Sequence, residues 1–469
     1  MTQTHIWWIR RDIRLKDNQA LEAAQNGANR LIPLFILEPD LLSKAAPKRR
    51  AFLLQALADL DQSLQKLGSR LVLRHGPALG AFQQLADDLG SIRIFAQEDF
   101  SPYARRRDQA VANRFDLSRH PGTVLRHPEE ITKTDGLPYS VFTPYKNAWY
   151  EQPLPTPAHI LPTPEHLPPL PDGLQTAGIP AFHPVQSFPG TAVEAQQRLD
   201  DFISEGIRHY RSRRDRLDLD GTSRLSPYLR FGLVSVREAF TRAAITELGA
   251  RDGETRKEIR TWMDELVWRE FYTMILYHHP NVMEGAYRPE YQRISWRDAR
   301  DDLRAWQAGQ TGYPVVDACM RQLNQSGWMH NRGRMITASF LTKDLLINWQ
   351  EGEDWFMHQL VDGDPAANNG GWQWSAGTGT DAAPYFRIFN PVLQGLKFDP
   401  EGDFIAQWVP ELAHLPVKYR HQPWELSAAE ANKFGVQIGR DYPERIVDHA
   451  FARERTLAAY QSARDQGSS

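Results

Sequence analysis

Short apolar runs recur through the first hundred residues of the chain and predict buried strands. Between the runs the hydrophobic positions take helical spacing, most clearly over 50–67, where phenylalanine and leucine recur every three or four residues. Strands that alternate with helices favour a parallel, doubly wound α/β sheet. The predicted strands lie at 5–9, 31–37, 70–73 and 92–95. We therefore predict an α/β domain over 1–128.

The first predicted strand ends in charged residues rather than in a glycine-rich turn. It leads directly into Arg10, Arg11 and Asp12, without the G-x-G-x-x-G pattern that holds a dinucleotide pyrophosphate. A nicotinamide dinucleotide site is therefore disfavoured. In such a sheet a ligand is still expected at the carboxyl ends of the strands.

The hydrophobic pattern fades in the middle of the chain and then becomes helical. Residues 129–195 are rich in proline and poor in periodicity, which is typical of an extended connector. From 196 to 469 the pattern is helical with few strand signals. The predicted fold class is thus α/β plus all-α, with an N-terminal α/β domain, a connector and a C-terminal helical domain.

One predicted helix, from 258 to about 277, has two distinct faces. The indole of Trp268 lies outside the main apolar face of this helix. Such an indole either packs on a second element or is reserved for a ligand, and the pattern favours neither. The apolar face holds Ile259, Trp262, Met263, Leu266, Val267 and Met274. The opposite face holds Glu265, Trp268 and Tyr272.

The stretch 361–391 combines turn residues with two carboxylates, two amides and two tryptophans. Its opening, DGDPAANNGG, predicts an irregular loop rather than a regular helix or strand. The loop should be ordered, because Trp372 and Trp374 would lose roughly 1.5–3 kcal/mol each if left in water. A binding loop and a well-packed core loop both fit this pattern.

Composition describes a globular chain with 41% hydrophobic and 24% charged residues. No apolar run approaches the length of a membrane span and the first residues lack a signal-peptide pattern, so we expect a cytoplasmic protein. The single cysteine, Cys319, excludes a disulfide framework, and we predict no metal site. The net charge of −3 does not indicate nucleic acid, although it can hide a local basic face. Tryptophan is unusually frequent, with 14 residues.

Three clusters in the helical half are candidates for chemistry. The hydroxyls of Thr222, Ser223 and Ser226 lie where a helix could begin, which suits a phosphate but also a plain helix cap. In WMHNRGRM (328–335), Asn331, Arg334 and Met335 would share a helix face, and Arg334 could pair with Asp362 or Asp364. Five arginines within 208–216 suit phosphates beside unstacked bases, or simply a solvated face.

Several blocks of the sequence, taken in order, resemble the photolyase/cryptochrome family, and most closely its class I cyclobutane pyrimidine dimer photolyases. The blocks are WIRRDIRLKDNQAL (8–21), FTPYKNAW (142–149), GTSRLSPYLRFG (221–232), ELVWREFY (265–272), TGYPVVDACMRQL (311–323), WMHNRGRM and the stretch 361–391. The resemblance covers nearly the whole chain. It implies an antenna domain, a helical FAD-binding domain and light-dependent repair of DNA.

The resemblance assigns a U-shaped FAD to the helical domain. Asn368 is expected at the edge of the isoalloxazine ring, where a neutral amide can stabilise an anionic reduced ring. The implied FAD-binding residues are Tyr210, Thr222, Ser223, Arg224, Leu225, Ser226, Trp262, Arg334, Asp362, Gly363, Asp364 and Asn368.

The resemblance also implies a pocket for a flipped-out pyrimidine dimer in UV-damaged DNA. Trp268 and Trp374 would be the aromatic walls, Glu265 would bond the pyrimidine edge, and Asn331 and Met335 would line the floor. The other residues implied to contact lesion or DNA are Arg214, Arg269, Tyr272, Arg332, Arg387 and Gln394. Trp296, Trp349 and Trp372 match the family's relay that reduces an oxidised flavin.

Several features remain open at this level. A second, antenna chromophore is expected, and the stretch SKAAP (43–47) together with QEDF (97–100) favours a deazaflavin over methenyltetrahydrofolate. A monomer without membrane partners is expected. The alternative to repair is a cryptochrome-type blue-light receptor, which commonly has a long C-terminal extension. Repair of the (6-4) photoproduct is disfavoured, because those relatives carry histidines where this chain has Asn331 and Met335.

Overall fold

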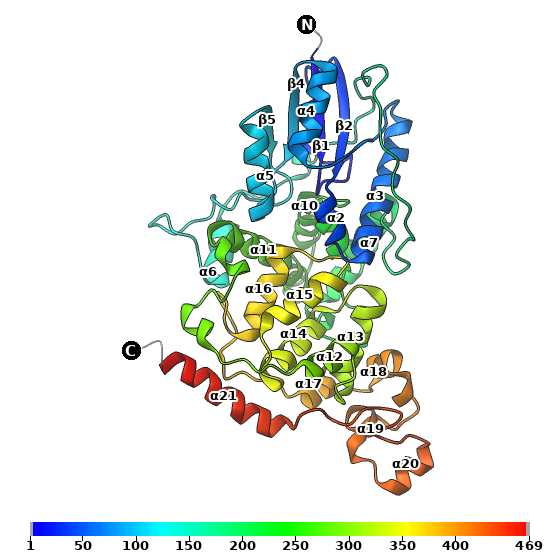
Figure 1. Cartoon of the computed structure of the whole chain (residues 1–469), viewed down its shortest axis with the longest axis vertical. Helices are drawn as coiled ribbons and strands as arrows, with labels where there is room; N and C mark the ends of the chain where they lie inside the picture. The colour runs from blue at the N-terminus through cyan, green and yellow to red at the C-terminus, as the bar shows by residue number, and fades with distance from the viewer. Residues whose placement is uncertain (1–2, 466–469) are drawn as a thin grey trace. The chain divides into compact units, whose positions relative to one another are not determined.

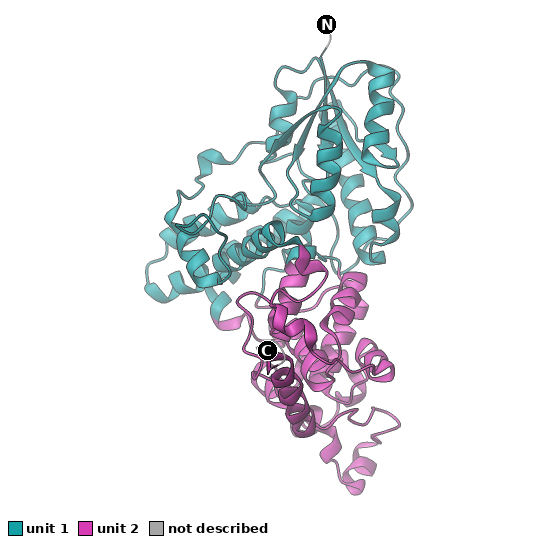
Figure 2. Ribbon diagram, turned by 60° about the vertical axis from the view of Figure 1, so that its left-hand side comes forward, with its two compact units in different colours: residues 1–211, 222–280, 361–366 teal, residues 212–221, 281–360, 367–469 magenta. Residues whose placement is uncertain are grey.

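The computed structural model describes residues 3–465, which form two compact units (Figure 2). Unit 1 contains the residues up to 211, together with 222–280 and 361–366. Unit 2 contains 212–221, 281–360 and the residues from 367 onward. Unit 1 therefore includes helices that the sequence pattern assigned to the C-terminal domain. The predicted domain boundaries at 128 and 195 stay a prediction.

A five-stranded, entirely parallel sheet lies in unit 1, in the order β3-β2-β1-β4-β5 (Figure 1). This order confirms the predicted doubly wound sheet. The central strand is buried over its whole length because apolar side chains cover both of its faces. The strands are β1 (Thr4–Ile9), β2 (Arg30–Leu37), β3 (Val72–His75), β4 (Ile92–Gln97) and β5 (Asp116–His120).

Two details of the sheet differ from the sequence pattern. β3 begins two residues later than the predicted third strand, at Val72 instead of residue 70. β5 was not predicted, because its sequence DLSRH has no apolar run. It lies at the edge of the sheet, where only one neighbour, β4, has to be paired.

The helices of unit 1 agree with the pattern except in the predicted connector. Within 129–195 a helix, α6, places Phe142, Tyr145 and Trp149 at helical spacing and buries all three. The proline-rich surroundings hide this short pattern. The helices are α1 (Gln19–Gln25), α2 (Pro39–Ser43), α3 (Pro47–Lys66), α4 (Ala78–Leu89), α5 (Pro102–Ala112), α6 (Phe142–Glu151), α7 (Ala192–Ser204), α9 (Ser226–Phe231), α10 (Val236–Leu248) and α11 (Gly253–His278).

Unit 2 is helical, as the pattern predicts. Its core gathers around Trp306, Phe340 and Trp372, and a short π-helical segment, Phe340–Asp344, continues one of its helices. Its helices are α12 (Arg300–Ala308), α13 (Pro314–Ser326), α14 (Asn331–Ser339), α15 (Trp349–Gln359), α17 (Pro391–Phe398), α18 (Asp403–Trp408), α19 (Val417–His421), α20 (Ala428–Phe434) and α21 (His449–Asp465). α8 (Tyr210–Arg213) and α16 (Pro365–Ala376) each have residues in both units.

The stretch 361–391 was predicted to open as an irregular loop, and this prediction was wrong. Residues 365–376 form the helix α16. Pro365 stands at the first turn, where its missing N–H costs nothing, and the Asp364 carboxylate accepts a hydrogen bond of 3.0 Å from the Ala366 N–H. Asn368 and Asn369 bond to other segments instead of competing with the helix backbone, as described below.

Within residues 3–465, no helix is long and apolar enough to cross a membrane.

Candidate functional site

The predicted lesion-binding residues of α11 share one face of that helix. Glu265, Trp268 and Tyr272 are half-buried, whereas the six predicted apolar residues of the opposite face are buried. The Trp268 ring stacks on Phe142 of α6, with centroids 3.6 Å apart and planes 9° apart. The Tyr272 ring lies 5.5 Å from Trp268. Phe142 therefore fixes the plane of the indole, and the side chain of Trp268 remains only half-buried.

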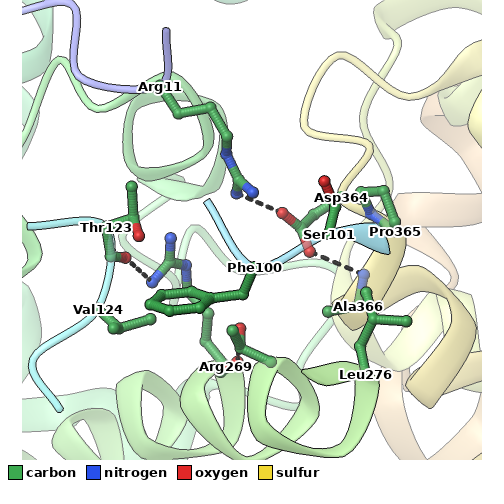
Figure 3. Close-up of a pocket in the computed structure, with 11 residues that line it drawn as sticks. Arg11, Phe100, Ser101, Thr123, Val124, Arg269, Leu276, Asp364, Pro365 and Ala366 are labelled. Atoms are coloured by element: carbon green, nitrogen blue, oxygen red, sulfur yellow. Dashed lines mark hydrogen bonds and ion pairs between the residues drawn. The ribbon is translucent and has the colours of Figure 1, made fainter. Parts of the chain in front are cut away.

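Arg269 has a different environment from its neighbours on α11. Its Nη1 donates to the Thr123 carbonyl oxygen at 2.8 Å. It lines a cavity of about 20 Å³ together with Arg11, Phe100 and Asp364 (Figure 3). Burial lowers the pKa of Arg269, and the nearby Arg11 adds to this effect. The predicted contact of Arg269 with DNA stays a prediction.

The hydroxyl-rich segment before α9 lies beside aromatic rings. Trp262 Nε1 donates to Ser223 Oγ at 3.3 Å. Phe202 of α7 links Trp262 and Tyr210, with ring centroids 5.2 and 6.0 Å away. The helix α9 begins at Ser226, as the pattern predicted, and Leu225 before it is buried. The structure thus brings together three of the predicted cofactor residues, Tyr210, Ser223 and Trp262, and sequence reasoning missed Phe202, which packs against two of them.

The turn from Asp362 to Pro365 is held by arginines that the sequence pattern did not assign to it. Arg11 Nη2 lies 2.5 Å from the Asp364 carboxylate (Figure 3). Arg230 Nε donates to the Gly363 carbonyl oxygen at 2.9 Å and lies 3.6 Å from Asp364. Burial and the neighbouring Arg11 lower the pKa of Arg230 to about 9. These contacts hold the start of α16.

Charged residues also occupy the carboxyl ends of β1 and β4, where a doubly wound sheet usually holds its ligand. Arg10 Nη1 lies 2.5 Å from Asp108, and its other Nη donates to the Gln97 carbonyl oxygen. Burial alone would raise the pKa of Asp99, but Arg11 and the Ser101 N–H outweigh it, and the pKa falls to about 2. Ion pairs and hydrogen bonds within the protein therefore involve the charged residues at these strand ends.

In unit 2, the predicted amide of the cofactor site is anchored to α15. Asn368 Nδ2 donates to the Glu353 carbonyl oxygen at 3.0 Å, and Asn369 Nδ2 donates to the Glu353 carboxylate at 3.1 Å. Both asparagines are buried. Burial raises the pKa of Glu353 to about 7, although the Asn369 hydrogen bond opposes the rise. Glu353 carries no motif signal in the sequence.

The three predicted relay tryptophans become progressively less buried. Trp372 is 2% exposed and Trp349 3%, while Trp296 is half-buried and packs against the same core. Trp372 lies on α16 and Trp349 begins α15. Trp374, two residues after Trp372, is half-buried, because residues two apart point to different sides of a helix.

A glycine missed by sequence reasoning determines where Trp372 packs. A Cβ on Gly352 would lie 2.1 Å from Trp372 Cη2 and 2.5 Å from its Cζ3. Gly352 stands one helical turn after Trp349 in α15, so the edge of the Trp372 ring lies against the backbone of that turn.

The predicted floor and backbone contacts of the lesion site lie on α14 and nearby segments. Asn331 and Met335 share a face, as predicted, with Asn331 Nδ2 4.0 Å from the Met335 sulfur. Arg332 lies 4.3 Å above the Phe398 ring and forms an ion pair of 2.8 Å with Asp215. Arg214 lies 3.9 Å from the same carboxylate. Asp215 is thus a shared partner that sequence reasoning missed.

Arg334, Arg387 and Gln394 are the other residues of unit 2 for which the resemblance implies a role in binding FAD or DNA. Arg334 Nε donates to the Met329 carbonyl oxygen at 2.9 Å, and its pairing with Asp362 or Asp364 stays a prediction. Arg387 is exposed and Gln394 of α17 is half-buried. Their contacts with DNA stay predictions as well.

A surface groove of about 840 Å³ lies in unit 1 beside α5 and the end of α11. Arg105, Arg106 and Arg119 line it together with Tyr277 and His127. The Arg105 guanidinium lies 4.1 Å above the Tyr277 ring. Glu98 and Glu129 line it as well, and Arg119 lies 3.7 Å from Glu98, so the groove combines charges of both signs with aromatic surface.

Two family models match the chain. One is described as DNA photolyase and matches 5–165, and the other is described as the FAD binding domain of DNA photolyase and matches 262–462. A deoxyribodipyrimidine photo-lyase from Halobacterium salinarum is 39% identical over 481 residues, covering 98% of this chain and 99% of the relative.

Solved structures agree with these matches. A bacterial class III photolyase from Agrobacterium tumefaciens has a TM-score of 0.92 at 37% identity, covering 99% of this chain and 98% of its own. A cryptochrome from Synechocystis has a TM-score of 0.88 at 28% identity, covering 97% and 99%. Both similarities extend over nearly the whole length of the chains.

Proposed function

This chain belongs to the DNA photolyase family, and we propose that it is a deoxyribodipyrimidine photo-lyase that splits cyclobutane pyrimidine dimers in DNA under blue or near-UV light. The observation that carries the proposal is the stack of Trp268 on Phe142, with Glu265 and Tyr272 on the same face of α11. A supported aromatic wall beside a carboxylate suits a base that has left the duplex. Full-length similarity to photo-lyases supports it further.

The residues of the proposed cofactor site fit FAD by their chemistry. Hydroxyls at Thr222, Ser223 and Ser226, next to the start of α9, suit phosphates. Asn368 offers a buried neutral amide whose NH₂ group donates a hydrogen bond to the Glu353 carbonyl oxygen. Its amide oxygen can then accept a hydrogen bond from an N–H group at the edge of the flavin. When FAD is bound and reduced, its chemistry is the light-driven transfer of one electron to the dimer, returned after the ring has opened.

The remaining cofactor residues would hold the molecule by shape and charge. We propose contacts from the buried Tyr210 and Trp262 and from the backbone of the turn at Gly363. Arg224 has a left-handed backbone conformation (φ 49°), which changes the direction of the chain within the segment that precedes α9. Further contacts are proposed for Leu225, Arg334, Asp362 and Asp364.

We propose that Trp268 and Trp374 stack on the dimer and that Glu265 bonds the edge of a pyrimidine. Asn331 and Met335 would complete the pocket, and Tyr272 would contact the lesion strand. Arg214 and Arg332 would bind phosphates of the backbone, with Asp215 orienting both guanidinium groups beforehand. Arg269, Arg387 and Gln394 are proposed as further DNA contacts.

We propose that Trp372, Trp349 and Trp296 conduct electrons from the surface to an oxidised flavin. Two of the rings, Trp372 and Trp349, are buried, and Trp296 is half-buried, which suits it as the ring nearest the solvent. Each indole can carry a transient radical, so the charge would move in steps.

A second chromophore is proposed for the N-terminal part of the chain, with deazaflavin favoured over methenyltetrahydrofolate. The groove beside α5, which combines arginines, glutamates and aromatic rings, is the candidate place for it. The absorption spectrum of protein purified from a host that makes both would distinguish them. We also propose that the enzyme acts as a monomer, in the cytoplasm, and lies on the nucleoid when bound to DNA.

The proposal can be tested by expressing the chain in a bacterial strain that lacks photolyase. We expect the chain to raise survival after UV irradiation only when the cells are then illuminated. The variant Trp268→Ala should give much less protection at equal expression. A light-dependent signal in the cells without a gain in survival would instead favour the cryptochrome-type receptor, which the Synechocystis structure keeps as the second candidate.

A further inference from the structure

The clasp formed by Arg11, Asp364 and Arg230 connects the end of β1 with the turn that begins α16. We propose that Arg11 is a positioning residue for the cofactor site, one that sets the turn from Asp362 to Asp364 in place before FAD binds. This inference rests on the proposed function, because that function makes the turn a contact of FAD.

Three backbone contacts show how the clasp fixes the turn. Arg230 Nε donates to the Gly363 carbonyl oxygen at 2.9 Å, and Asp364 accepts from the Ala366 N–H at 3.0 Å. Arg11 Nε in turn donates to the Arg230 carbonyl oxygen at 3.3 Å. Gly363, Asp364 and Ala366 are thus each tied to a guanidinium group or to the carboxylate that this group holds, and Figure 3 shows the two contacts of Asp364, with Arg11 and with Ala366.

The same segment of chain also touches the end of α9. A Cβ on Gly232 would lie 2.1 Å from the Arg11 carbonyl oxygen, and Gly232 has φ 71°, a conformation that favours glycine. The Ile13 N–H donates to the Phe231 carbonyl oxygen at 3.1 Å. α9 begins at Ser226, within the proposed phosphate-binding segment. Arg11 therefore contacts the turn that carries Asp364 and also the C-terminal end of α9, the helix whose first residue belongs to the other proposed FAD-binding segment.

The charges of the clasp favour positioning over stability. The side chains of Arg11 and Asp364 are 17% and 15% exposed, and a largely buried ion pair contributes little net stability compared with apolar side chains of the same size. Burial opposes the charge on Arg11, but Asp364 and Asp99 outweigh it and raise its pKa. The guanidinium group of Arg11 stays charged and has two parallel N–H donors, so its main contribution is to fix the geometry of the turn at Asp364.

The chain offers a matched control in Lys16. Its Nζ lies 2.7 Å from the Glu238 carboxylate and so joins the same segment after β1 to α10. This ion pair, like the clasp, links the α/β part of unit 1 to one of its helices, but it makes no contact with residues 362–366. The Lys16 side chain is 47% exposed against 17% for Arg11, so the free energy of unfolding of each variant is measured as well, which separates a loss of positioning from a general loss of stability.

The test compares Arg11→Gln, Arg11→Lys and Lys16→Gln as apoproteins. FAD affinity is measured by titration, and amide hydrogen exchange of 361–371 is measured without flavin. We expect Arg11→Gln to weaken FAD binding by about tenfold or more and to speed exchange at Gly363 and Ala366. Arg11→Lys, which keeps the charge but loses the fork, should lie between Arg11→Gln and the wild type. Lys16→Gln should match the wild type in both measurements.

Two results would overturn the inference. One is wild-type exchange of 363–366 in Arg11→Gln, which would mean that the clasp does not hold the turn. The other is FAD affinity that falls equally in Arg11→Gln and Lys16→Gln, which would make the effect one of general stability. If the wild-type protein bound no FAD, the proposed function would fail, while the exchange measurement would still decide whether Arg11 holds the turn.

Discussion

A methyl group on Gly352 should disconnect the proposed electron relay while leaving repair intact. The new Cβ would lie 2.1 Å from Trp372 Cη2 and 2.6 Å from Leu341 Cδ2. Ordinary carbon contacts lie at about 3.5 Å, so the ring or the helix has to give way by roughly 1.4 Å, the difference between 3.5 and 2.1 Å. Overpacking of this kind costs about 1–3 kcal/mol.

The expected result follows from what the displaced ring does. Trp372 is the innermost of the three proposed relay rings, and it packs against the turn of α15 that carries Trp349. We expect Gly352→Ala to slow photoreduction of oxidised FAD by about tenfold or more, since a displacement near 1 Å can cost this much in a reaction that depends on geometry. Repair by chemically reduced protein should remain, as it should in Trp349→Phe.

Two further variants separate the relay from general damage to the core. Gly371→Ala lies next to Trp372 in α16, but its Cβ would meet nothing within 4 Å, and it should photoreduce like the wild type. Gly352→Ala combined with Trp372→Phe removes the overlapping ring atoms, so it should unfold at a denaturant concentration closer to that of the wild type than Gly352→Ala does. Wild-type photoreduction in folded, FAD-loaded Gly352→Ala would refute the reasoning.

Three other changes test separate parts of the account. Trp268→Ala should weaken binding of dimer-containing DNA by about ten- to a hundredfold and leave undamaged duplex almost unaffected; equal losses on both DNAs would assign the ring to general DNA binding. Arg332→Gln should weaken binding to both DNAs and reduce the slope of log affinity against log salt by about one, and an unchanged slope would contradict a phosphate contact. Glu353 has a pKa of about 7 in the folded protein against 4.5 ordinarily, so the folded state keeps a proton that the unfolded chain releases, and stability falls as the pH rises through this window. Glu353→Gln keeps the contact with Asn369 and should remove up to about 1.4 kcal/mol per pH unit of that fall. Glu351→Gln, on the same helix with a side chain that is 41% exposed, should not remove it. If the free energy of unfolding fell by the same amount between the two ends of this pH window in both variants, the result would count against a buried proton.

The sequence pattern predicted those elements whose periodicity is long and apolar. β1, β2 and β4 are buried on both faces, so their runs are continuous and easily recognised. The edge strand β5 needs no such run because only one side of it is paired within the sheet. The two faces of α11 were correct residue by residue, because a helix of 26 residues shows its period several times over.

The prediction failed where local and tertiary signals conflict. The residues of DGDPAANNGG favour turns, yet 365–376 is helical, because Asp364 caps the helix and contacts outside it bind the side chains of Asn368 and Asn369. Sequence spacing cannot reveal such partners. Arg11 and Gly352 were missed for the same reason, since their roles depend on segments more than a dozen residues away.

Family resemblance supplied most of the candidate site. Spacing alone left Trp268 undecided between packing and binding, and the structure shows that its half-buried ring does pack, stacked on Phe142 and beside Phe271 and Tyr272. The block FTPYKNAW contained that partner, but nothing in the pattern linked it to α11. The short helix α6 was missed within the proline-rich segment, although Phe142, Tyr145 and Trp149 follow the helical spacing of three and four residues.

The most direct measurement follows the dimer itself. Purified protein, chemically reduced, is incubated with an oligonucleotide that carries one cyclobutane thymine dimer, under near-UV or blue light and in the dark. The account predicts that intact thymines are restored in the illuminated sample alone. An illuminated sample in which the dimer persists, or one that loses no more dimer than its dark partner, would contradict it.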